Sequence, residues 1–173
     1  MARTVELRRH TDDDDDELSE EGVKAALELG ARVEGGYDLL VSSGAQRSTQ
    51  TIACLLAARG ERVENGLVIE HGLRSEVEDR WRDAYGKAGS GELEALEAAD
   101  PELVAQDGAA LAAGLKRIFS RLPEGGRALA VGHSPTNEAA VYGLTGERIA
   151  PMGKGEGVLL IAEGERYRVD PLA

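Results

Sequence analysis

The chain has little cysteine, few aromatic residues and no long apolar run. Its one cysteine, Cys54, lies in an apolar stretch, so no internal disulfide and no zinc site built from several thiolates can form. We expect this thiol to be buried and unreactive. No segment approaches the length that spans a membrane, and the amino terminus lacks the apolar core of a signal peptide, so we expect a cytoplasmic protein without membrane partners.

Positive charge is also scarce. The sequence has 20 Lys and Arg residues against 32 Asp and Glu residues, which gives a net charge of −12. Such a chain repels phosphate backbones, so general binding to nucleic acid or to anionic membranes is excluded. At 173 residues the chain is long enough to bury a sizeable core, and we expect one domain over residues 1–173.

Strand-like and helix-like segments alternate along the sequence. We expect strands at residues 5–9, 37–43, 68–69 and 128–132, and a terminal hairpin at 158–162 and 166–169. We expect helices near 23–30 with Ser19 as N-cap, at 46–59 ended by Gly60, within 73–99 with a break near 86–91, at 101–122, and after Ser134-Pro135. This alternation predicts a three-layer α/β/α sandwich with a mostly parallel central sheet. Glu6 and Arg8 fit poorly, because they give a central strand a polar face.

Two of the three histidines close predicted strands. His10 follows Arg9 at the end of the first strand, and His133 ends the strand at 128–132. The carboxyl ends of parallel strands meet at the sheet edge where ligands bind. Imidazole is a good nucleophile towards phosphorus, and a guanidinium matches phosphate oxygens. An Arg-His pair is by itself more often a surface feature, so the interpretation depends on further segments.

Arg47 is the next such feature. It lies in the first turn of the helix that follows strand 37–43, where its charge opposes the helix dipole. An arginine at such a position either binds an anion or pairs with a nearby carboxylate. Beside His133, Gly132 would let the backbone approach a ligand closely, and the following helix would direct free amides into the same space.

The segment 71–81 offers a carboxylic acid. Phosphoryl transfer from an ester requires a proton for the leaving oxygen. We take Glu76 as the first candidate for the proton donor and Glu78 as the second, although glutamates in such a stretch are more often merely solvated.

Together these segments resemble the histidine phosphatase superfamily, also called phosphoglycerate-mutase-like, over essentially the whole chain. The short loop after His10 is similar to the small bacterial phosphohistidine phosphatases. The matching motifs, in order, are Arg9-His10, Leu18-Ser19-Glu20-Glu21-Gly22, Ser42-Ser43 through Arg47 to Gln50-Thr51, and Gly132-His133.

The resemblance implies a role for each site residue. His10 would be the nucleophile that forms a phosphohistidine, Arg9, Arg47 and His133 would bind the phosphoryl oxygens, and Glu76 would be the proton donor. The substrate would be a small phosphomonoester or a phosphohistidine protein, and neither a metal nor another cofactor is implied. Asn137 and Lys154 are possible substrate contacts.

Two departures from the family pattern keep alternatives open. Thr11 stands where the family has glycine, and the acidic run 12–17 follows the nucleophile directly. We favour a solvated loop for this run; cation binding and screening against highly anionic substrates are alternatives. Its charges would also tend to raise the pKa of His10. A rival hypothesis is therefore a non-catalytic module that binds a phosphorylated ligand, and a third is an acidic interaction protein.

Overall fold

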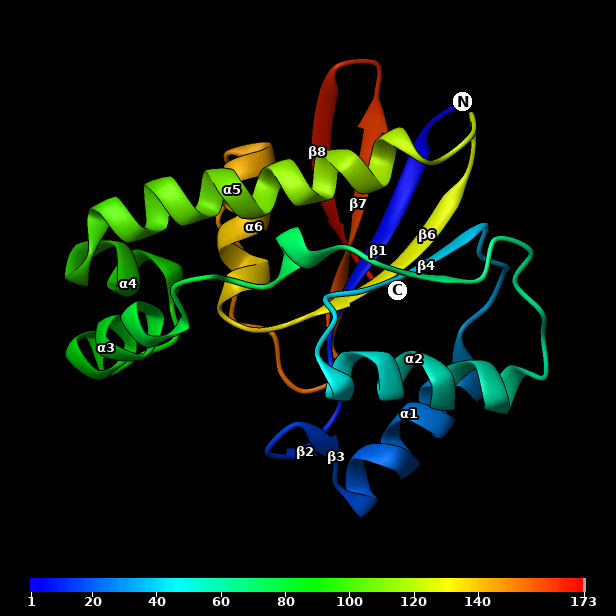
Figure 1. Cartoon of the computed structure of the whole chain (residues 1–173). Helices are drawn as coiled ribbons and strands as arrows, with labels where there is room; N and C mark the ends of the chain where they lie inside the picture. Colours follow the sequence, from blue (N-terminus) through cyan, green and yellow to red (C-terminus); the bar gives the residue numbers. More distant parts are fainter. Residues whose placement is uncertain (173) are drawn as a thin grey trace.

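A computed structural model describes residues 1–172 and shows a three-layer α/β/α sandwich (Figure 1). The strands are β1 (Arg3–Arg9), β2 (Asp13–Asp14), β3 (Glu17–Leu18), β4 (Leu39–Ser42), β5 (Leu67–Ile69), β6 (Arg127–Gly132), β7 (Gly157–Glu163) and β8 (Arg166–Pro171). The helices are α1 (Glu20–Arg32), α2 (Gln46–Arg59), the 3-10 turn η1 (His71–Leu73), α3 (Glu78–Ala88), α4 (Leu93–Ala99), α5 (Pro101–Ser120) and α6 (Thr136–Thr145). The predicted fold class is confirmed.

The central sheet has the strand order β5-β4-β6-β1-β7-β8. The first four of these strands run parallel, and β7 and β8 form an antiparallel edge. In this register Arg9 of β1 lies opposite Gly132 of β6, and Ser42 of β4 lies opposite Val131 of β6. The carboxyl ends of three strands therefore meet at one edge, which brings together the segments around His10, Ser43 and His133.

Helices cover both faces of the sheet. On one face, α1 and α2 pack over β4 and β6, where Leu29, Ile52 and Leu55 contact a small apolar cluster. On the other face lie α5 and α6, with α3 and α4 beyond them (Figure 1). None of the helices in residues 1–172 is long and apolar enough to cross a membrane.

Most predicted elements are present, with two differences. Helix 46–59 has its predicted bounds, and Ser19 caps α1 by accepting a hydrogen bond from the Gly22 amide. The helix expected within 73–99 begins only at Glu78, because residues 74–77 form an irregular segment. The acidic run, expected as a loop, folds into the short β2–β3 hairpin.

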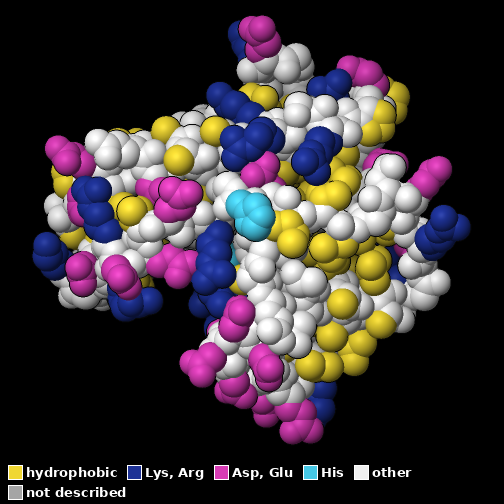
Figure 2. All heavy atoms as spheres, viewed as in Figure 1, with side chains coloured by type: hydrophobic (Ala, Val, Ile, Leu, Met, Phe, Trp, Pro, Cys, Tyr) yellow, Lys and Arg dark blue, Asp and Glu magenta, His cyan; other side chains and the backbone are white. Residues whose placement is uncertain are grey.

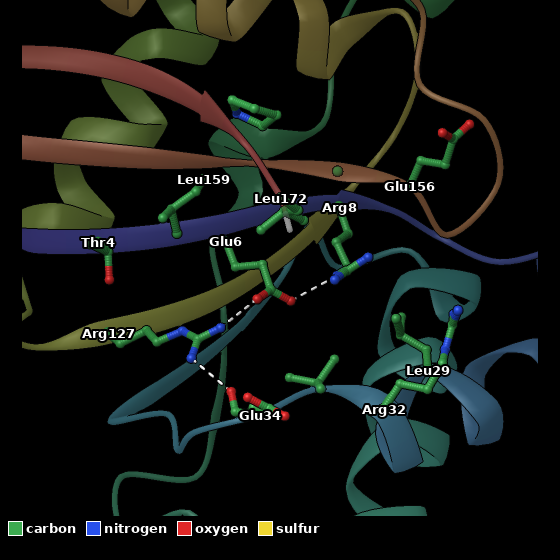
Figure 3. Close-up of a pocket in the computed structure, with 13 residues that line it drawn as sticks. Thr4, Glu6, Arg8, Leu29, Arg32, Glu34, Arg127, Glu156, Leu159 and Leu172 are labelled. Carbon is green, nitrogen blue, oxygen red and sulfur yellow. Dashed lines mark hydrogen bonds and ion pairs between the residues drawn. The ribbon is translucent and has the colours of Figure 1, made fainter.

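The polar face of β1 contains a buried ionic network. The Glu6 carboxylate is 1% exposed and accepts hydrogen bonds of 2.7 Å from both Arg8 and Arg127 (Figure 3). It also accepts one of 3.0 Å from the Tyr37 hydroxyl. This network lines a cavity of about 890 Å³ between β1, β6 and the end of α1. A buried carboxylate is tolerated when charged partners compensate it, so the poor fit of Glu6 and Arg8 has a physical explanation.

Candidate active site

A second cavity, of about 730 Å³, opens at the carboxyl edge of the sheet. In Figure 2 the molecule is hollowed between the end with α3 and α4 and the end with β2 and β3, and Lys and Arg side chains border the hollow. The cavity brings together four predicted site residues: Arg9, His10, Arg47 and His133. Glu78 and Lys154 also line it, whereas Glu76 and Asn137 do not.

His10 is buried and held in one tautomer. Its Nδ1 lies 2.8 Å from the carbonyl oxygen of Thr11, an acceptor only, so Nδ1 carries the proton and donates. The lone pair is then on Nε2, the atom left for the cavity. Burial lowers the pKa of His10 and outweighs the Thr11 carbonyl and the Asp13 carboxylate, which both raise it. The imidazole is therefore neutral near pH 7, the form that a nucleophile requires.

Thr11 does not disturb this arrangement. Its amide donates to Thr51 Oγ1 at 3.2 Å, and its hydroxyl donates to the Gly22 carbonyl at 2.8 Å. Thr11 is not among the described residues with a positive φ, so the backbone needs no glycine here. The threonine instead ties the nucleophile segment to α1 and α2.

His133 faces His10, with ring centroids 5.3 Å apart. Ser43 Oγ donates to Ser48, so it accepts from His133 Nε2 at 2.8 Å, and His133 Nδ1 accepts from Arg47 at 3.3 Å. Burial first, and then the charge of Arg47, lower the pKa of His133 to about 3. His133 is thus neutral and fixed from both sides.

The two arginines are held by groups at the cavity rim. Arg47 also donates to the Asp16 carboxylate at 2.9 Å, and Arg9 donates to the Met152 carbonyl at 3.0 Å. The pKa of Asp16 is lowered: burial raises it, but the backbone amides of Arg47 and Gln46 and the charge of Arg47 lower it further. Of the two alternatives for Arg47, the structure shows the pairing with a nearby carboxylate, and binding of an anionic ligand stays a prediction.

The acidic run is not merely a solvated loop. Lys154 pairs with Asp13 and lies 3.4 Å from the Asp12 carboxylate, while Asp16 pairs with Arg47. Acidic side chains of the hairpin therefore neutralise cations of the cavity. Within residues 1–172, no three His, Cys, Asp or Glu side chains gather as a metal site.

The family model of the histidine phosphatase superfamily (branch 1) matches residues 3–156. The chain belongs to the histidine phosphatase superfamily. This superfamily works through a covalent intermediate on histidine. No curated protein matches the sequence.

Solved structures of other proteins share the fold at low sequence identity. A phosphoglycerate mutase from Bacillus anthracis is 19% identical with a TM-score of 0.69, covering 99% of this chain and 92% of that one. A mycobacterial glucosyl-3-phosphoglycerate phosphatase with inorganic phosphate is 18% identical with a TM-score of 0.65, covering 98% and 95%. The protein histidine phosphatase SixA with tungstate is 16% identical with a TM-score of 0.61, covering 96% and 94%.

The two candidate proton donors of this histidine phosphatase lie in different places. Ser75 is buried and donates to Asp107 at 2.7 Å, and the exposed Glu76 that follows it does not line the cavity. Glu78 lies at the start of α3, lines the cavity and accepts a hydrogen bond from Arg74 at 2.7 Å. Of the two carboxyl groups, only Glu78 can face a substrate in this cavity.

The segment after His133 differs from its prediction. A β-carbon built on Gly132 would lie 2.5 Å from Oδ1 of Asn137, so the glycine makes room for this side chain rather than for a ligand. Asn137 Nδ2 donates to the Arg8 carbonyl at 3.1 Å, a structural contact. Ser134 does not cap α6; its hydroxyl donates to the carboxyl of Glu138.

Glu138 is a residue that the sequence reasoning missed. It is fully buried in the first turn of α6, and burial raises its pKa to about 7. The available signal was a lone acidic residue directly before the apolar residues Ala139, Ala140 and Val141. A charged residue within such a run is rarely fully buried without a specific reason.

Proposed function

We propose that this histidine phosphatase is a metal-independent hydrolase that cleaves a phosphomonoester or a protein phosphohistidine through a covalent phosphohistidine on His10. The observation that carries the proposal is the state of His10: neutral, with Nδ1 bound to the Thr11 carbonyl and Nε2 left for a cavity lined by two arginines. Residues 1–173 act as one cytoplasmic domain in this proposal.

The first step is attack of His10 Nε2 on phosphorus. The N–P bond forms as the bond to the leaving group breaks, while Arg9 and Arg47 bind the phosphoryl oxygens and stabilise their charge. Arg47 must exchange the Asp16 carboxylate for a phosphoryl oxygen. His133, fixed by Ser43, lies across the cavity and positions Arg47. Water then attacks phosphorus, which releases inorganic phosphate and restores His10.

The cavity supports a small phosphorylated molecule or an exposed phosphohistidine side chain as substrate. Its wall carries Trp81 and Tyr85 from α3, and its rim combines acidic and basic groups. The structural neighbours include a phosphatase of glucosyl-3-phosphoglycerate and a protein histidine phosphatase, so both substrate classes occur on this fold.

The decisive experiment combines a phosphatase panel with alkaline rapid quench. We expect phosphate release in the presence of EDTA, and a phosphohistidine at His10 that the quench traps. His10→Ala should abolish both. His71→Ala is the matched control, because His71 is exposed and does not line the cavity. Turnover by His10→Ala equal to that of the wild type would disprove the nucleophile assignment.

One observation supports the hypothesis of a non-catalytic binding module: Arg47 already donates to the Asp16 carboxylate. A phosphorylated ligand could replace this carboxylate on Arg47 without any reaction taking place. This hypothesis predicts that phosphate or tungstate binds in the cavity and that no ester or phosphoamide on the panel is cleaved. A trapped phosphohistidine would rule this hypothesis out.

A further inference from the structure

Glu138 and Ser134 form a hydrogen-bonded pair that reaches from the protein interior to the cavity. Glu138 is 0% exposed, and the Ser134 hydroxyl donates to its Oε2 atom. Ser134 lines the cavity directly after His133. The other carboxyl oxygen, Oε1, is buried and has no hydrogen-bond partner among the described residues. A buried carboxyl oxygen without a partner is costly, so the position calls for an explanation beyond packing.

The positive charge of Arg9, on β1, acts on Glu138 without an ion pair between them among the described residues. The Arg9 Nε atom is itself buried without a hydrogen-bond partner in the described chain. Met152, from the segment before β7, acts on the Glu138 carboxyl group only through its backbone. Burial raises the pKa of Glu138 to about 7, while the hydrogen bond from Ser134, the backbone of Glu138 itself, the charge of Arg9 and the backbone of Met152 lower it in part. Protonated and ionised forms therefore both exist near neutral pH.

Glu78, the other candidate proton donor near the cavity, is partly exposed and paired with a guanidinium, unlike the buried Glu138. Its side chain is 42% exposed, and it accepts a hydrogen bond from Arg74. In this contact the Glu78 carboxylate serves as a hydrogen-bond acceptor. A buried carboxyl group that is partly protonated is the better proton source.

We propose that Glu138 supplies the proton for the leaving group through the Ser134 hydroxyl. This inference rests on the proposed function. When Glu138 is protonated, its carboxyl donates to Ser134 Oγ; this reverses the direction of the hydrogen bond between them and frees the Ser134 hydroxyl proton for the substrate. As the N–P bond forms and the P–O bond breaks, the leaving oxygen takes the hydroxyl proton of Ser134, and Ser134 takes the carboxyl proton of Glu138. In the second half-reaction, water attacks phosphorus and its proton returns through Ser134 to Glu138. Ser134 is the residue that contacts substrate, whereas Glu138 positions the Ser134 hydroxyl and supplies its proton.

The test uses esters whose alcohols differ in acidity. An aryl leaving group such as p-nitrophenolate departs without a proton, whereas an alkyl alkoxide such as that of glycerol phosphate does not. We expect Glu138→Gln to lower the ratio of alkyl to aryl kcat/KM by about 10²-fold, the lower range for general acid catalysis. In the wild type, alkyl kcat should fall as pH rises above about 7, and this limb should be absent in Glu138→Gln.

Further variants separate the relay from a structural role. Ser134→Ala should reproduce the change in the ratio, and Ser134→Thr, which keeps the hydroxyl, should restore it. Glu165→Gln, at an exposed position outside the cavity, should keep the wild-type ratio. An equal loss on both ester classes in Glu138→Gln and Ser134→Ala would overturn the relay, and so would a lower ratio in Glu78→Gln alone. Absence of turnover by the wild type on every substrate would instead overturn the proposed function.

Discussion

Arg47 donates a hydrogen bond of 2.9 Å to the carboxylate of Asp16, within the cavity that both residues line. The carboxylate occupies a donor that the proposed mechanism assigns to a phosphoryl oxygen. Arg47 also contacts His133, so this one guanidinium connects the acidic hairpin to the second histidine. In the proposed mechanism, phosphate and Asp16 therefore compete for the Arg47 guanidinium.

The first prediction concerns this competition. Asp16→Asn should strengthen inhibition by inorganic phosphate or tungstate, because the rim loses one negative charge and Arg47 is released. The Asp16 side chain is 51% exposed, and exposed ion pairs contribute about 0.2–1 kcal/mol, so we expect an improvement of about 1.5- to 5-fold in the inhibition constant.

Asp15→Asn is the matched control for that prediction. Asp15 lies in the same hairpin and lines the cavity, but it has no ion pair within the described chain. Its φ is 54°, a conformation that asparagine also adopts readily. An equal gain in Asp15→Asn would show that general charge, rather than the Arg47 contact, controls anion binding.

A second prediction concerns the acid side of the pH profile. His10 must be neutral to attack, so kcat/KM should fall as pH drops through the His10 pKa, which lies below 6.5. Asp13 lies 3.8 Å from His10 Nδ1 and raises that pKa. Asp13→Asn should therefore move the acid limb to lower pH. A pH series with an aryl phosphate measures it, and a limb that moves upwards would contradict the electrostatic role of Asp13.

The third prediction concerns the pH dependence of stability, to which His133 and Glu138 make opposite contributions. The folded pKa of His133, about 3, lies below its ordinary value of 6.5. The contribution of neutral His133 to the free energy of unfolding is therefore complete above pH 6.5 and is lost as pH falls. The folded pKa of Glu138, about 7, lies above 4.5, so ionisation destabilises the protein as pH rises. Between pH 7 and pH 5 the two effects oppose each other, each by about 2 kcal/mol.

Single variants should reveal the opposed effects. Glu138→Gln should have a free energy of unfolding that falls by about 2 kcal/mol more than the wild type between pH 7 and pH 5. His133→Gln should show the opposite change over the same range. Urea denaturation at both pH values measures these differences, and parallel pH dependence of all three proteins would contradict the assignment.

A fourth prediction concerns the contact between Gly132 and Asn137. Gly132→Ala should destabilise the protein by about 1–3 kcal/mol, because the added methyl group collides with the asparagine amide. Asn137→Ala removes the colliding oxygen, so the double variant should be more stable than the sum of the single effects indicates. Additive effects in this cycle would show that the glycine serves another purpose.

Some features of this site follow from sequence, because local pattern and chain order determine them. The alternation of apolar strands with helices predicts a parallel sheet, and a parallel sheet places the ends of β1 and β6 at one edge, so the meeting of Arg9-His10 with His133 could be predicted. The position of Arg47 follows in the same way from the strand-to-helix turn before α2.

Tertiary structure alone decided the rest, because burial and partners come from segments distant in sequence. Glu6 is tolerated through Tyr37 and Arg127, and Gly132 accommodates Asn137. Glu76 is exposed and lies outside the lining of the cavity. Glu138 has the same origin: only packing around α6 removes its carboxyl group from water and leaves Ser134 as its route to the cavity. The sequence by itself determined which groups of the phosphoryl site would meet, whereas the packed interior determined their protonation states.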